Sequence, residues 1–178
     1  WNTDIYTYGR ERRRGRKRVR MAIAAGDEFV VSSLANAEET IRLGAPREKV
    51  NRIVWYVDLR PFGPEHRDHG LRGRLGWPED SLVVLSLRNY RPNTNLDVLV
   101  RAFSRVAKEV PEARLILAAR GGWVKEEIDA LLDELALRDR VAQVFAKSDE
   151  LPMYAASADV GVSIASTDAT PASMVESM

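Results

Sequence analysis

Two carboxylates near the end of the sequence, Asp168 and Glu176, have the residue types and the spacing of a ligand-binding segment. Seven residues separate them, and among these Thr170 and Pro171 have the pattern of a helix start. Threonine is favoured as an N-cap residue, and proline is tolerated at the first helical position because its missing N–H is not needed there. The pattern therefore predicts a helix N-terminus flanked by two acidic side chains.

The predicted helix start offers backbone donors to a negatively charged ligand. The first amides of a helix have no partner within it, so those of Ala172, Ser173 and Met174 would point outward. Such amides, together with the helix dipole, attract phosphate. A ligand with a phosphate between hydroxyl groups suits amides flanked by carboxylates, and a sugar nucleotide has this chemistry.

A polar loop, residues 88–95, follows a strand-like run and supplies a second set of candidates. Arg88 is the first residue past that run, and a guanidinium can bind phosphate through two parallel hydrogen bonds. Arg91 and Asn95 are further candidates; the alternative is that the arginines are solvated and that Asn95 only caps the next helix. Lys147, which follows a later strand, completes the set, although a lysine there is more often solvated.

Alternating strand and helix patterns from residue 81 onward place these candidates in an α/β domain. Short apolar runs predict strands, and apolar residues at helical spacing, such as Leu96, Leu99 and Phe103, predict helices. The predicted strands are 81–87, 113–119, 141–146 and 159–165, and the predicted helices are 96–110, 124–136 and 150–158. Right-handed crossovers between such units give a doubly wound, Rossmann-like parallel sheet with helices on both faces.

Ligands of open α/β sheets bind at the carboxyl ends of the strands. The loops expected at that edge are 88–95, 120–123, 146–149 and 166–170. The two candidate segments therefore follow different strands but should share one edge of the sheet.

The first eighty residues predict a separate group of elements. These are a basic helix at about 11–25, a strand at 27–33, a helix at 35–43 that ends at Gly44, and a strand at 50–57. Residues 61–78 contain three prolines and four glycines and have the composition of an irregular linker. Because the last predicted helix stops in its second turn, we interpret the sequence as part of a larger protein, incomplete at both ends.

The sequence lacks the residues that several functional classes need. The chain has no cysteine, which excludes disulfides and thiolate metal sites. It contains neither a G-x-G-x-x-G nor a P-loop pattern, and His66 and His69 have no third metal ligand nearby. No apolar run approaches the length of a membrane span and no signal peptide is visible, so the expected location is cytoplasmic.

The charge of the chain is distributed unevenly. Residues 10–20 carry eight basic side chains and one acidic one, whereas the whole chain has a net charge of +1. A basic block on an acidic body indicates contact with an anionic surface, either nucleic acid or anionic lipid. The alternative is a solvated helix face whose acidic partners lie in sequence outside this chain.

With these patterns established, the sequence resembles the nucleotide-sugar-binding half of a GT-B glycosyltransferase, most closely the retaining family 4, or glycosyl transferases group 1, class. Residues 158–178 are similar to the family pattern aDvxvxxSxxDgxxxsxxEaM, and residues 85–103 resemble its phosphate loop and the helix that follows. Asn2 and Tyr56 replace glycines that are usual in the family. Further matching stretches are Trp1–Ile5, Asp27–Ser33, Leu43–Val50 and Ile53–Phe62.

The resemblance assigns roles to the residues at the end of the chain. Asp168 and Glu176 match the two acidic positions of the family's Glu-x7-Glu motif, with aspartate in place of the first glutamate. Asp168 would contact the donor sugar, and Glu176 would hold the ribose of the nucleotide. The backbone and hydroxyl groups of Thr170, Ala172 and Ser173 would meet phosphate or sugar.

The family's arginine–lysine pair after the first strand is only half retained. Arg88 serves as the arginine, but the lysine position falls among asparagines at 93–95. Arg91 would then compensate for the lysine, and Asn95 and Lys147 would add contacts to the nucleotide or its phosphates.

The resemblance also implies domains, reaction and partners. Residues 1–60 would end the acceptor domain and its inter-domain region, 61–80 would form a linker, and 81–178 the donor-binding domain. A hexose would pass, with retained configuration, from a nucleoside-diphosphate sugar to a hydroxyl of an acceptor glycan or lipid-linked glycan, in glycan or polysaccharide biosynthesis. No metal or other cofactor is expected, and this chain alone would be inactive.

The basic segment from Arg10 to Arg20 would, by the same resemblance, bind the enzyme peripherally to the anionic inner face of a membrane, with no nucleic acid as partner. Two alternatives remain open at this point. A nucleotide-sugar epimerase of the same fold would use the same cleft, and a non-enzymatic protein with a basic arm would bind nucleic acid.

Overall fold

The computed structural model describes residues 5, 13–54, 56–166, 168 and 171–177. Contacts divide the chain into two units: residues 1–56 with 167–171, and residues 57–166 with 172–178. The second unit contains the sheet whose carboxyl edge the sequence predicts as a binding site.

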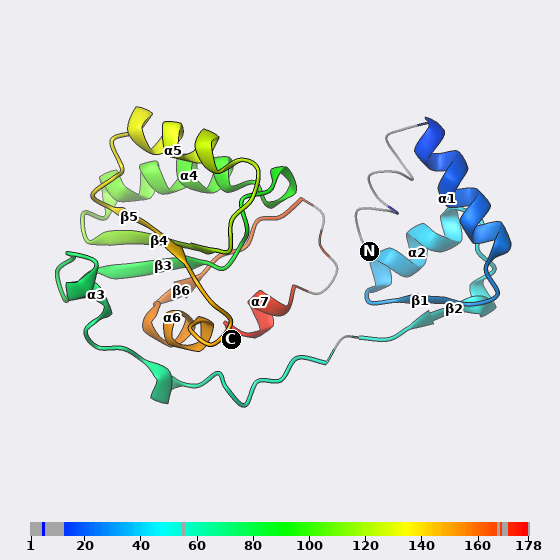
Figure 1. The fold of residues 1–178 in the computed structure, drawn as a ribbon, viewed down its shortest axis with the longest axis horizontal. Coiled ribbons are helices and arrows are strands. Elements are labelled where there is room, and N and C mark those ends of the chain that lie inside the picture. Colours follow the sequence, from blue (N-terminus) through cyan, green and yellow to red (C-terminus); the bar gives the residue numbers. More distant parts are fainter. Residues whose placement is uncertain (1–4, 6–12, 55, 167, 169–170, 178) are drawn as a thin grey trace. The chain divides into compact units, whose positions relative to one another are not determined.

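The first unit is a small α/β arrangement around a parallel pair of strands (Figure 1). Its elements are α1 (Arg13–Ala25), β1 (Phe29–Val31), α2 (Leu34–Arg42) and β2 (Val50–Arg52). The Ser33 hydroxyl caps α2 by accepting the Asn36 N–H at 3.1 Å. Gly44 follows the helix with a φ of +118°, a conformation that glycine adopts without strain, so the predicted end of this helix is confirmed.

The second unit is a four-stranded parallel sheet in the order β5-β4-β3-β6 (Figure 1). The strands are β3 (Leu82–Ser86), β4 (Ala113–Ala119), β5 (Val141–Phe145) and β6 (Val160–Gly161). Helices α4 (Leu96–Glu109) and α5 (Lys125–Glu134) pack on one face, and α3 (Leu71–Arg74) and α6 (Leu151–Ser157) on the other. The predicted parallel sheet with helices on both faces is therefore confirmed.

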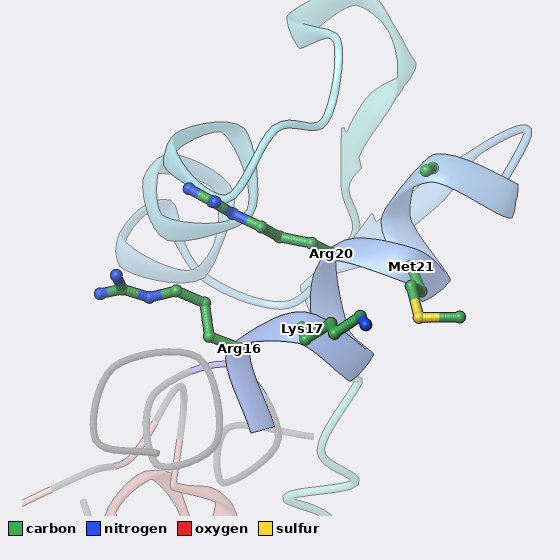
Figure 2. A pocket seen from close by; sticks show the side chains of 5 residues that line it. Arg16, Lys17, Arg20 and Met21 are labelled. Carbon is green, nitrogen blue, oxygen red and sulfur yellow. The ribbon is translucent and has the colours of Figure 1, made fainter. Parts of the chain in front are cut away.

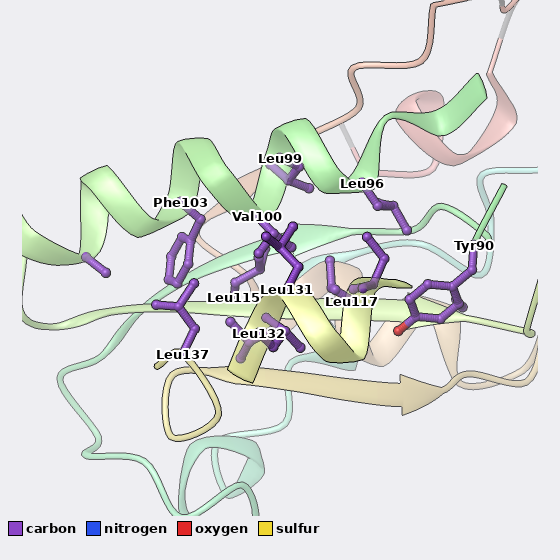
Figure 3. Close-up of a cluster of buried hydrophobic side chains, with 14 of the residues drawn as sticks. Tyr90, Leu96, Leu99, Val100, Phe103, Leu115, Leu117, Leu131, Leu132 and Leu137 are labelled. Atoms are coloured by element: carbon purple, nitrogen blue, oxygen red, sulfur yellow. The ribbon is translucent and has the colours of Figure 1, made fainter. Parts of the chain in front are cut away.

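Strand β4 is buried on both faces from Leu115 to Ala119, which explains why that run is continuously apolar. Leu115 and Leu117 face α4 and α5, where they join the side chains shown in Figure 3. Ile116 and Ala118 point the opposite way, into the cluster under α6. All four are at most 3% exposed, so the central strand joins the two halves of the core.

Strand β6 is shorter than the predicted 159–165. Among the residues that the structure describes its only partner is β3, and Gly161 lies opposite Leu85 near the end of that strand. The Val162 N–H still donates to the Leu85 carbonyl at 2.8 Å, and beyond it β3 offers no further ladder partner. The predicted strands at 27–33 and 50–57 are also trimmed, to three residues each.

The segment expected as an irregular linker differs from that prediction, because part of it packs against the second sheet. Leu71 and Trp77 are buried there. Arg72 is only 5% exposed and donates to the Ser81 carbonyl and to the Asp159 carboxylate, both at 2.9 Å. The same carboxylate accepts the Val83 N–H at 2.7 Å, so one ion pair joins α3 to the starts of two neighbouring strands.

This ion pair predicts a large loss of stability for Arg72→Met. The substitution leaves the Asp159 carboxylate without its counter-charge and the Ser81 carbonyl without its donor, and breaking such a pair costs about 3–5 kcal/mol. Urea denaturation followed by circular dichroism measures the change. Arg105→Met, on the exposed surface of α4, is the control and should shift stability by less than about 0.5 kcal/mol. Equal effects of the two variants would contradict the prediction.

Candidate functional site

The candidate site lies where the direction of the sheet's connections reverses. The chain passes from β3 to β4 on one side and returns through β6 on the other. The loops after β3 and β6 therefore lie next to each other at the carboxyl edge, and open α/β sheets bind ligands at such a switch point. Two hydrogen bonds tie these loops together: Asn95 Nδ2 to the Ile164 carbonyl at 2.9 Å and the Ser166 N–H to the Asn93 carbonyl at 3.0 Å.

The Asn95 side chain joins the loops after β3 and β6. Its φ of 53° lies in the left-handed region, which asparagine tolerates better than most residues. The side chain makes no capping bond to α4, and its Nδ2 instead donates to the Ile164 carbonyl. Its predicted contact with the nucleotide remains a prediction.

The structure brings together two predicted site residues, Arg88 and Ser173. Arg88 follows β3 and is half-buried, and its Nη1 donates to the Ser173 hydroxyl at 3.4 Å. Ser173 belongs to α7 (Ala172–Val175), which begins one residue after the Pro171 predicted as its first residue. Ala172 is exposed at the start of that helix, and Thr170 lies outside the described residues.

Glu176 follows α7 and is half-buried. Burial raises the pKa of its carboxyl group, and the positive charge of Arg120 acts in the opposite direction. The carboxylate is therefore partly shielded from water and lies within the electrostatic influence of a guanidinium. A hydroxyl donor that replaces water at this carboxylate would meet a strong acceptor.

The predicted partner of Glu176 across the helix start is Asp168. Asp168 is exposed, and contacts group residues 167–171 with the first unit. The joint action of the two carboxylates on one ligand thus stays a prediction.

Arg120 is a candidate that the sequence reasoning missed. It follows β4 directly, donates its backbone N–H to Asn89 Oδ1 at 2.9 Å and bonds the Ser148 hydroxyl through Nη2. One side chain therefore spans the loops after β4 and β5. The signal that singled out Arg88, an arginine just past a buried strand, applies equally to Arg120.

A hollow of about 280 Å³ lies beside Arg120, between the loops after β3 and β4. Arg91, predicted to contact the nucleotide, is exposed and lines this hollow together with Trp123. Lys147 is exposed after β5, and its backbone N–H donates to Glu150 Oε2 at 2.8 Å. The other residues that line the hollow are Asn89, Arg120, Gly121 and Gly122.

A close backbone contact joins the two loops that line this hollow. Tyr90 is buried, its N–H donates to the Gly121 carbonyl at 3.1 Å, and its hydroxyl accepts from Gln143 at 3.0 Å. Burial raises the pKa of the Tyr90 hydroxyl. A Cβ at Gly122 would lie 2.0 Å from the Tyr90 carbonyl oxygen, so only glycine fits there.

We therefore expect Gly122→Ala to separate these loops and Gly121→Ala to do so much less. Both glycines have a positive φ, +148° and +113°, and strain at such positions costs about 1–3 kcal/mol. Only Gly122 adds a steric clash, because nothing lies within 4 Å of a Cβ at Gly121. Thermal unfolding should show Gly122→Ala to be less stable than Gly121→Ala by about 1–3 kcal/mol; equal stabilities would contradict this account.

The first unit carries a separate surface of interest on α1. Gly15 and Ile23 are buried and Val19 is half-buried, so these residues form the packed side of the helix. The opposite side is exposed to solvent. A hollow of about 350 Å³ is lined there by Arg16, Lys17, Arg20, Met21 and Ala24. Figure 2 shows Arg16 and Arg20 extending to the same side of the helix.

No group of three or more His, Asp or Glu side chains in the described part is placed to hold a metal ion. No helix in that part is both long enough and apolar enough to cross a bilayer.

Together, the parallel sheet and the helices on both of its faces define a Rossmann-like α/β fold. Residues 70–178 match the family model described as glycosyl transferases group 1. The chain belongs to the glycosyl transferases group 1 family.

Curated relatives agree with this assignment. D-inositol 3-phosphate glycosyltransferase of Xylanimonas cellulosilytica is 33% identical over 125 residues, covering 67% of this chain and 30% of the relative. The enzyme of the same name from Kineococcus radiotolerans is 32% identical over 151 residues, covering 79% and 35%. The chain thus spans about a third of the length of these relatives.

Solved structures share the fold at low sequence identity. Anabaena HepE in complex with UDP and glucose has a TM-score of 0.79 and 19% identity, covering 91% of this chain and 46% of that protein. Sucrose-phosphate synthase of Thermosynechococcus elongatus has a TM-score of 0.78 and 18% identity, covering 98% and 44%.

Proposed function

We propose that this chain forms the donor-binding part of a retaining glycosyltransferase that transfers a hexose from a nucleoside-diphosphate sugar to an acceptor hydroxyl. The observation that carries the proposal is the Arg88–Ser173 contact at the switch point of the sheet. In this contact a half-buried guanidinium lies beside Ser173, one of the residues for which the family resemblance implies contact with phosphate or sugar. A structural relative, Anabaena HepE, is described in complex with UDP-glucose, which supports a ligand of this class.

The proposed chemistry needs positive charge where the nucleoside diphosphate leaves. When the bond from the sugar to the diphosphate breaks, negative charge grows on the phosphate oxygens. Arg88 and the backbone amides at the start of α7 would stabilise that charge, and one such donor contributes roughly a hundred- to thousand-fold in rate. Protein groups, rather than a metal ion, would thus stabilise the charge on the leaving diphosphate.

The carboxylates would orient the rest of the donor. Glu176 would accept hydrogen bonds from the ribose hydroxyls, and Asp168 would contact the hydroxyls of the transferred sugar. Thr170, Ala172 and Ser173 would meet the phosphates or sugar between these two carboxylates. The assigned residues would then follow the order of groups in a sugar nucleotide: Asp168 at the sugar, residues 170–173 at the phosphates and Glu176 at the ribose.

Three further side chains would support the nucleotide. Arg91 would supply part of the charge that the family's lysine normally provides, because asparagines occupy residues 93 and 95. Asn95 would support the nucleotide by holding the loop after β6 in position. Lys147 would add a positive charge at the edge of the site.

The test of this proposal is nucleotide binding to the chain and to Glu176→Ala. Ligand-observed NMR with UDP, GDP, ADP and dTDP should detect at least one nucleotide. Glu176→Ala should weaken that binding about tenfold or more, because it removes a charge-assisted hydrogen bond that contributes about 1.5–3 kcal/mol. Glu127→Ala, an exposed carboxylate on α5, is the control. Binding of no nucleotide, or equal binding by both variants, would overturn the proposal.

We further propose that the enzyme acts on a glycan or lipid-linked glycan at the inner face of a membrane, in polysaccharide biosynthesis. The support is the exposed cationic surface of α1, where Arg14, Lys17 and Arg18 are exposed. Each basic side chain near an anionic bilayer contributes about 1 kcal/mol to binding. The first turn of α1 contains no acidic residue, so its helix dipole adds to the attraction for anions.

The membrane proposal predicts a charge-dependent partition into vesicles. Arg14→Gln with Lys17→Gln should weaken binding to vesicles of phosphatidylserine and phosphatidylcholine roughly thirty-fold, since two cations contribute about 2 kcal/mol. Vesicle sedimentation measures the change, and Arg105→Gln with Lys108→Gln, also exposed cations, is the control. Unchanged sedimentation would contradict the proposal, and salt-dependent binding to duplex DNA without vesicle binding would favour the nucleic-acid alternative.

A further inference from the structure

The hollow between the loops after β3 and β4 has a lining that the proposed chemistry leaves largely unused. Trp123 stands at this hollow with 85% of its surface exposed. A tryptophan usually buries most of its large apolar surface, so this exposure makes the indole available to a ligand. Its polar surroundings, which include Arg91 and Arg120, distinguish the position from an ordinary apolar patch.

The backbone around Trp123 is fixed although its side chain is not packed. On one side, the close contact of Gly122 with Tyr90 holds the chain. On the other side, the Val124 N–H donates to the Tyr90 carbonyl at 3.3 Å and α5 begins at Lys125. The indole is therefore presented on a rigid support, and a ligand that covers it would not have to order the loop.

The lining of the hollow selects a particular chemistry. A flat indole stacks on planar π systems, and guanidinium groups both stack on such planes and attract negative charge. Arg91 and Arg120 supply two guanidinium groups at the same hollow. The class of ligand that satisfies both features is an aromatic heterocycle attached to an anionic group, as in a nucleotide.

Arg120 connects this hollow to the carboxylate assigned to the ribose. It lines the hollow, and its charge also acts on the half-buried Glu176. Arg120 is therefore shared by the hollow and the electrostatic surroundings of Glu176. In a nucleotide the base is attached directly to the ribose, so a base near Arg120 is consistent with a ribose at Glu176.

We propose that Trp123 stacks on the base of the nucleoside-diphosphate donor, with Arg91 and Arg120 at the rim of the same hollow. This inference rests on the proposed function, because it takes Glu176 as the ribose ligand. Stacking on an aromatic side chain accepts any base, so Trp123 contributes affinity for the base without choosing among bases. Loss of one such stacking contact weakens binding roughly five- to one-hundred-fold.

The experiment compares nucleotides with a ligand that has no base. The chain and its variants are titrated with UDP, GDP, ADP and inorganic pyrophosphate by ligand-observed NMR. Trp123→Ala should weaken binding of the nucleotides five- to one-hundred-fold and leave pyrophosphate binding unchanged. Trp123→Phe should restore most of the affinity, because it retains an aromatic ring. Val106→Ala, another exposed apolar side chain, on α4, is the control and should change neither.

The outcomes separate this inference from the proposed function. Nucleotide binding that Glu176→Ala weakens and Trp123→Ala does not would overturn the inference and leave the function standing. Equal weakening of nucleotides and pyrophosphate by Trp123→Ala would overturn it also, because the effect would not concern the base. If the unsubstituted chain binds no nucleotide, both the inference and the proposed function fail.

Discussion

The candidate site depends on the position of β3 between β4 and β6. Parallel pairing on both sides makes β3 the strand from which the chain departs in one direction and to which it returns from the other. The loops that follow β3 and β6 therefore lie next to each other, and the bonds from Asn95 and Ser166 join them. Without β6 beside β3, Arg88 would have no α7 to meet. The geometry of the binding edge is thus a consequence of strand order rather than of any single loop.

The same arrangement of an arginine and a serine hydroxyl occurs twice at the carboxyl edge of the sheet. Arg88 and Arg120 each lie just past a buried strand, where the chain first reaches solvent. Each guanidinium is directed by a hydroxyl on a neighbouring segment, Ser173 in one case and Ser148 in the other. The strands bring positive charge to one edge, and the serines limit the conformations of the arginine side chains. An anionic ligand at this edge would meet groups that are already oriented.

Much of this arrangement could be predicted from the sequence, because local patterns determined it. Strand β4 matches its predicted range, since its run from Leu115 to Ala119 is apolar, as expected of a strand buried on both faces. The length of β6 could not be predicted, because it depends on where its partner β3 ends. The roles of Arg120 and Trp123 depend on which loops become neighbours, and that depends on strand order. The packing of α3 could not be predicted for a similar reason, because Arg72 pairs with a carboxylate 87 residues further along the chain.

That separation has a consequence for the order in which the second unit folds. During synthesis, β3, β4 and β5 are complete well before Asp159 emerges, and domains fold as units once their sequence is available. Until then the Arg72 side chain, which is buried in the finished structure, lacks its carboxylate. Contacts between residues far apart in sequence form slowly, because loop-closure entropy opposes them. The ion pair between α3 and β6 would therefore form among the last contacts, and it would couple completion of the sheet to assembly of the binding edge.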